Sequence, residues 1–192
     1  MADNFPITTT LISDDLAVGW QTAFGLTVDF SPIEDSGHIV RSWNGQARNL
    51  AADEFKLFQC TISSTDDMRP PALSHMWPGA TFTIIPPCEF SDAIQPGAQS
   101  RTLIRYPYKD DDTGYTSIRC LTKNFEPVSF TVWNKVITLS APATETVRIF
   151  YRPWIDLFVT EPWSVSSHEQ NATVQWSLTA EEVGGLDWQG DN

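Results

Sequence analysis

Two neighbouring runs, TVRIFYRPWIDLFVT at residues 146–160 and ATVQWSLTAEEV at residues 172–183, decide the fold class of this chain. The first is a strongly apolar run of β-type residues with one interruption, at Pro153. In the second, Trp176 and Leu178 alternate with polar residues, which predicts a strand with one packed face and one face that is wet or contacts a partner. The segment between the runs carries Pro, Ser and Asn, so we expect two or three strands that fold back on one another.

Aromatic side chains are dense in the same stretch. Trp154, Phe158, Trp163 and Trp176 each offer about 150–250 Å² of surface for burial, enough to nucleate a small antiparallel sheet. We therefore expect Trp154, Trp176 and Leu178 to belong to the structural core.

The rest of the chain predicts further short strands separated by turns. Asn44-Gly45 is a strong hairpin signal because both residues tolerate positive φ, and Asn134-Lys135 and KDDDTG at 109–114 each separate two β-type runs. About nine or ten strands with almost no helix predict an all-β fold, an antiparallel β-sandwich or a closely related barrel with long loops. We expect one domain over residues 1–192. The main expected strands cover residues 26–30, 38–43, 54–63, 80–85, 103–108, 115–121, 128–133 and 136–140.

The chain is acidic, with 24 Asp and Glu against 12 Lys and Arg, a formal net charge of −12 and a pI of about 4.4. Binding phosphates requires clustered Lys and Arg, so we expect no direct nucleic-acid binding, and an anionic membrane surface would repel the chain. No stretch approaches the roughly twenty apolar residues of a transmembrane helix, and the amino terminus lacks a secretory pattern. We expect no membrane segment, and a chain kept in the cytoplasm until it is assembled.

The cysteines Cys60, Cys88 and Cys120 form no CxxC pair, and an odd number is typical neither of a zinc framework nor of a disulfide scaffold. A bridge between Cys60 and Cys88 requires that their strands be neighbours. The alternative is reduced, buried thiols.

The sequence contains none of the common catalytic or metal-binding motifs. His38, His75 and His168 are far apart and lack a second ligand at helical spacing. The loop at 110–114 fails the spacing of an EF-hand and is better interpreted as a solvated acidic turn. Carboxylates are numerous, but no spacing selects a pair for glycoside hydrolysis, and GxSxG, HExxH and phosphate-binding glycine loops are absent. We expect no enzyme, no metal and no cofactor.

Two blocks of the sequence carry distinctive motifs. Residues 62–91 carry a strand, a polar Ser-x-Asp element, a PAL turn and a WPG turn before a strand that ends in a cysteine. Residues 149–183 carry YRP, a late W-S-L pattern and an acidic EEV ending. Both blocks resemble virion proteins of long-tailed bacteriophages, and the second resembles their carboxyl-terminal part. The residues that carry the resemblance are Asp66, Pro71, Ala72, Leu73, Trp77, Pro78 and Gly79, and then Tyr151, Arg152, Pro153, Trp176, Leu178, Glu181, Glu182 and Val183.

The resemblance implies a minor structural protein of the tail, a distal tail or tail-tip ring protein that joins the tube to the baseplate hub. Its partners would be further copies of itself, in a hexameric or trimeric ring, and the tube and hub proteins. Head-to-tail contacts close such a ring, and strand edges and aromatic loops can supply them. The expected location is the tail of the virion.

We expect the contacts with partners at Asp66, Pro71, Leu73 and Trp77, in the loop from Asp66 to Gly79, and at Asp111 and Asp112 in the hairpin tip. Residues 184–192 are a possible flexible carboxyl-terminal arm whose Trp188 docks on a neighbour; a frayed terminus is the alternative.

Two other functions remain open. The eight tryptophans suit a carbohydrate-binding module at the phage tip, which requires exposed aromatics. The other is a head-decoration or head-to-tail joining protein, which would differ from a tail-tip protein in symmetry and in its neighbours but not in the properties of the subunit itself.

Overall fold

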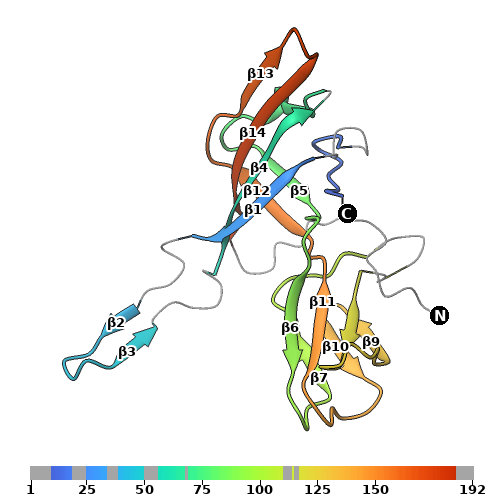
Figure 1. The fold of residues 1–192 in the computed structure, drawn as a ribbon. Helices are drawn as coiled ribbons and strands as arrows, with labels where there is room; N and C mark the ends of the chain where they lie inside the picture. Colours follow the sequence, from blue (N-terminus) through green and yellow to red (C-terminus); the bar gives the residue numbers. More distant parts are fainter. Residues whose placement is uncertain are drawn as a thin grey trace. The chain divides into compact units, whose positions relative to one another are not determined.

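The computed structural model describes residues 10–18, 25–33, 39–49, 56–67, 69–109, 114 and 117–184. The structure is nearly all β, with several antiparallel sheets, and within the described residues no sheet closes into a barrel (Figure 1). The all-β prediction is therefore confirmed. The strands are β1 (Thr27–Pro32), β2 (Ile39–Arg41), β3 (Ala47–Asn49), β4 (Phe58–Asp67), β5 (Thr81–Ile84), β6 (Phe90–Ile94), β7 (Ser100–Thr102), β8 (Arg119–Leu121), β9 (Phe130–Trp133), β10 (Val136–Leu139), β11 (Val147–Tyr151), β12 (Ile155–Val159), β13 (Ser164–His168) and β14 (Thr173–Glu182), with one 3-10 turn at Leu73–His75.

The chain forms two compact units. Unit 1 comprises residues 1–12 and 84–155, and unit 2 comprises residues 13–83 and 156–192. The single domain over residues 1–192 that the sequence predicts stays a prediction, and each unit is described by itself below.

Unit 1 is sandwich-like. It contains the sheets β7-β10-β9 and β6-β11-β8, each of three antiparallel strands. Their apolar side chains share one core, because alternate residues of each strand point to the same face of its sheet. Ile137 of β10 and Ile149 of β11 are fully buried in this core. The other buried members are Ile94, Leu103, Ile118, Cys120, Leu139, Ala143, Val147 and Tyr151.

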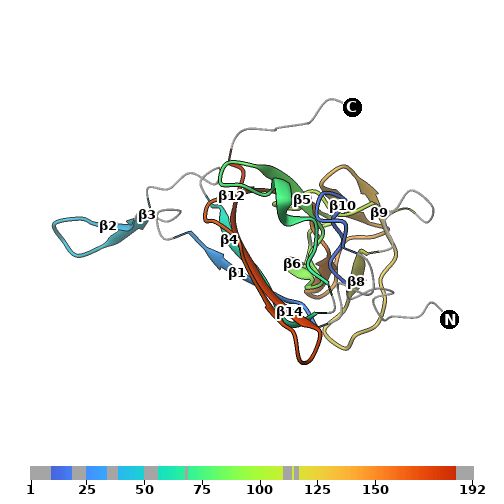
Figure 2. The same cartoon turned by 90° about the horizontal axis from the view of Figure 1, so that it is seen from above.

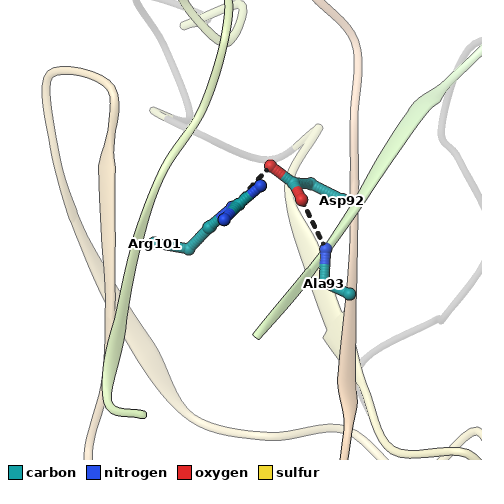
Figure 3. A network of polar contacts seen from close by, with 3 residues as sticks. All are labelled: Asp92, Ala93 and Arg101. Atoms are coloured by element: carbon teal, nitrogen blue, oxygen red, sulfur yellow. Dashed lines mark hydrogen bonds and ion pairs between the residues drawn. The ribbon is translucent and has the colours of Figure 1, made fainter. Parts of the chain in front are cut away.

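An ion pair joins the edge strands of these two sheets. Arg101 of β7 donates from Nε to Asp92 Oδ2 of β6 at 2.9 Å, and the other carboxylate oxygen accepts the backbone N–H of Ala93 at 2.7 Å (Figure 3). The Asp92 side chain is 16% exposed and that of Arg101 is 49% exposed. The pair therefore lies between core and solvent at the rim of the sandwich.

Unit 2 is built around β14. Its main sheet has the order β1-β4-β14-β12-β5, with β13 added to β14, and Figure 2 shows these strands from above. In β14 the residues Trp176, Leu178 and Ala180 are buried, and those between them are partly exposed. Leu178 pairs with Ile62 of β4, which is also buried. The period-two alternation of residues 172–183 is thus confirmed.

The prediction that Trp154 is a core residue is wrong. Its side chain is 46% exposed, while Trp176 and Leu178 are 2% and 1% exposed. The run at 146–160 is two strands, β11 and β12, which belong to different sheets and are separated at Pro153. The odd-numbered residues from Val147 to Val159 are all buried, so the alternation keeps the same parity across Pro153, and Trp154 falls at an even-numbered, exposed position.

The hairpin predicted from residues 103–108 and 115–121 is also wrong. The nearby strands β7 and β8 belong to different sheets and pair with β10 and β11. Residues 106–108 instead contact the chain near Pro153. Tyr108 N donates to Arg152 O and Trp154 N donates to Tyr106 O, each at 2.8 Å.

Candidate interaction surfaces

The β2–β3 hairpin, residues 39–49, forms where Asn44-Gly45 predicts it. Gly45 has a φ of +81° and donates its backbone N–H to Ser42 O at 2.8 Å, while Ser42 N donates to Gln46 O at 3.0 Å. Asn44 Oδ1 accepts from Gln46 N at 3.2 Å. Arg41 pairs with Ala47 across the ladder, so the loop is residues 42–46, longer than the two-residue turn expected.

The surface of this hairpin is apolar and basic. Ile39, Val40 and Trp43 are 69%, 39% and 100% exposed. Arg41 and Arg48 are exposed, and no Asp or Glu lies within residues 39–49. Arg41 donates to Gly45 O at 3.3 Å, within the hairpin itself. Among the described residues neither arginine has an ion pair, and β2 and β3 pair only with each other.

A second group of exposed aromatic residues lies in unit 1 beside the β9–β10 turn. Lys135, in this turn, places Nζ 4.4 Å from the ring centroid of Tyr106, and its carbonyl accepts the N–H of Leu103 at 2.8 Å. Trp133, at the end of β9, is 78% exposed, and Trp154, whose backbone N–H bonds Tyr106 O, is 46% exposed. We call Tyr106, Trp133 and Trp154 the aromatic group of unit 1.

The loop that the sequence selects as a partner contact is only partly available. Trp77 is 67% exposed, and its indole donates to Ser74 O at 3.2 Å. Pro71 and Leu73 are buried, which contradicts their prediction as contact residues. The 3-10 turn folds this segment inward, and Ala72 N donates to Leu16 O at 3.0 Å, so the apolar side chains fill the interior of unit 2.

The remaining predicted contact residues give no structural outcome. Asp66 lies in β4, but its side chain is outside the described part of the structure. Asp111, Asp112 and Trp188 lie outside the described residues, and so does the arm at 185–192.

Strand β13 presents a further surface. All five of its residues are exposed, and it pairs with β14 alone among the described strands. Ser164 and Ser177 join the two strands through their hydroxyl groups at 2.9 Å. The outer edge of β13 therefore offers backbone N–H and C=O groups to an added strand.

Arg152, by contrast, is a buried structural anchor in unit 1. Arg152 is only 3% exposed. Its guanidinium donates hydrogen bonds to three backbone carbonyls, those of Thr10 at 2.6 Å, Pro86 at 2.7 Å and Ile85 at 3.2 Å. Burial lowers the pKa of the guanidinium from its ordinary value. The sequence marked Arg152 only by its resemblance block and gave no sign of this role.

The titratable clusters offer little ligand chemistry. Within the described residues no disulfide joins Cys60, Cys88 or Cys120, and burial raises the pKa of Cys120 to about 12. Within the described residues no group of three His, Cys, Asp or Glu is placed to hold a metal ion. The same part of the chain contains no helix long and apolar enough to cross a membrane.

Sequence reasoning missed the basic hairpin, although a signal was present. In a chain with 24 acidic residues, the eleven positions from Ile39 to Asn49 contain two arginines and no carboxylate. Local charge, not the net charge, would have identified it.

Comparisons with protein families, with curated proteins and with solved structures find no match to this chain.

Proposed function

We propose that this chain is a structural subunit of a bacteriophage tail that acts by assembling with copies of itself and with other tail proteins. The observation that carries the proposal is the β2–β3 hairpin, which exposes Ile39, Val40 and Trp43 and pairs only with itself among the described strands. An isolated two-stranded hairpin is at best marginally stable in water. A hairpin with these side chains gains stability when another chain covers it.

The assignment to a tail rests on the resemblance of residues 62–91 and 149–183 to virion proteins of long-tailed bacteriophages, which implies a structural protein of the tail. The outer edge of β13 suits such a subunit, because β-strand addition is a common way to join chains. The position at the distal end of the tail, between tube and hub, is part of the same proposal.

Immunogold labelling of intact tailed particles tests the proposal. An antibody is raised against the purified chain and applied to particles produced by the genome that encodes it. We expect label at the tail, concentrated at its tip. Label on the head or at the neck would favour a decoration or joining protein, and particles without the chain would contradict a virion role.

The aromatic group of unit 1 favours a second candidate, carbohydrate binding. Trp133 and Trp154 are exposed, as a sugar platform requires, although Trp176 is buried. A glycan-binding screen with wild-type protein and Trp133→Ala tests this function. Binding that the substitution weakens supports it, and no binding to any glycan in the screen contradicts it.

A further inference from the structure

The two faces of the β2–β3 hairpin have the same character. Cross-strand partners point to one side of a ladder, and successive residues point to opposite sides. Val40 and its partner Arg48 therefore share one face, while Ile39 and Arg41 share the other. Each face presents one aliphatic side chain beside one arginine, and Trp43 is fully exposed in the connecting loop.

The charge of the hairpin is opposite to that of the chain that carries it. The rest of the chain holds all 24 acidic residues and ten of the twelve basic ones. Several of those carboxylates are exposed on unit 2, among them Asp29 on the edge strand β1, Glu161, and Glu169 after β13. A second copy of the chain thus supplies the acidic surface that Arg41 and Arg48 lack within the described part of their own chain.

We infer that the β2–β3 hairpin is a docking arm that binds an acidic surface of a second copy of this chain. The inference rests on the proposed function and names the partner of the same surface. The contact is heterologous, since the hairpin of one copy meets a different surface of the next, and such contacts generate rings or filaments. Trp43 alone can bury about 150–250 Å², a substantial part of the roughly 800 Å² that each partner contributes to a stable interface.

Nucleic acid is a poorer occupant for the hairpin. Tight binding to DNA neutralises several phosphates, typically about 6–10 contacts, whereas the hairpin has two arginines. The remaining acidic surface would also repel a polyanion. A carboxylate surface requires only that each guanidinium find one partner.

Sedimentation velocity of the full chain over a concentration series tests the arm. The variants are Arg41→Glu with Arg48→Glu, and Trp43→Ser. The matched control is Lys123→Glu with Arg148→Glu, which changes the net charge equally at exposed positions of unit 1. Far-ultraviolet circular dichroism checks that each variant folds.

We expect wild type to self-associate and both hairpin variants to raise the dissociation constant, Trp43→Ser by about 30-fold, as for an interface hot spot. The control should stay within about twofold of wild type, the scatter expected of rim charges. Raising the salt concentration should weaken wild type and have little effect on the arginine variant.

Three results would overturn the inference. If wild type self-associates and both hairpin variants do so with the same dissociation constant, the hairpin is not a docking arm, and the tail assignment is unaffected. A wild-type chain that remains monomeric at low salt and its highest soluble concentration removes self-docking. Nucleic acid that copurifies with wild type and is lost from the arginine variant assigns the hairpin to a polyanion. The tail assignment is judged separately by the immunogold label.

Discussion

The β9–β10 and β2–β3 hairpins begin from similar local sequence and end in opposite environments. In each, a run rich in β-type residues precedes a turn that contains asparagine. In β10, Ile137 is fully buried, because β7 extends the sheet and a second sheet packs on its inner face. In β2, Ile39 is 69% exposed. The turn makes a hairpin, whereas the third strand and the facing sheet make a core.

Burial should therefore separate side chains that bear on stability from side chains that bear on binding. The largest test uses two tryptophans of unit 2. Trp176→Ala should lower the free energy of unfolding by about 3–5 kcal/mol, because it empties a buried site between strands. Trp43→Ala should change it by less than about 0.5 kcal/mol, since that side chain is fully exposed.

Urea denaturation followed by circular dichroism measures both values. If Trp43→Ala lowers the free energy of unfolding of the monomer as much as Trp176→Ala does, the hairpin is part of a core and the contrast between the two regions is wrong.

The next test compares two arginines. Arg152→Met removes the donor to three backbone carbonyls and should cost about 1–3 kcal/mol or more, the usual penalty for leaving buried polar groups unpaired. Arg48→Met, on the exposed hairpin, should leave the midpoint of denaturation unchanged. Equal midpoints for wild type and Arg152→Met would show that water replaces the guanidinium and that the site is not an anchor.

A smaller effect is expected from Cys120, a buried thiol of β8. Burial raises its pKa from 9.0 to about 12, so the folded chain holds the proton that the unfolded chain loses. The resulting stability is fully present below pH 9 and is lost as pH rises toward 12, at up to about 1.4 kcal/mol per pH unit.

The measurement is the free energy of unfolding of wild type and Cys120→Ala at pH 8, 9 and 10. The wild type should lose more stability than the variant above pH 9. Parallel curves would mean that the thiol ionises equally in the folded and unfolded chains.

The sequence predicts local features of this fold well and non-local pairing poorly. The alternation around Trp176 and Leu178 and both asparagine turns need only neighbours along the chain, and each is found in the structure. Residues 103–108 also look like a strand, but Tyr108 pairs with Arg152, far away in sequence. No local pattern encodes that partner.

The candidate surfaces divide in the same way. Because loops are usually exposed, the sequence predicts that the whole segment from Asp66 to Gly79 is accessible to a partner. Trp77 is exposed, as this predicts. Leu73 is buried, because an apolar side chain in a loop can turn back into the interior when one helical turn directs it there. The hairpin arginines were missed because the net charge of −12 averages over them.

The Asp92–Arg101 pair tests the intermediate case between core and exposed hairpin. Asp92→Asn removes the charge while its side-chain oxygen can still accept the N–H of Ala93, so the change isolates the ion pair. We expect a loss of about 0.2–1 kcal/mol, because the arginine is half exposed and water screens the pair. A double-mutant cycle with Arg101→Met gives the coupling energy, and 1 M salt should reduce it. A coupling energy well above this range would show that the ion pair at the rim contributes to stability as the buried side chains do. A coupling energy of zero would show that the pair contributes nothing to the free energy of unfolding, as we expect of the exposed hairpin arginines in the monomer.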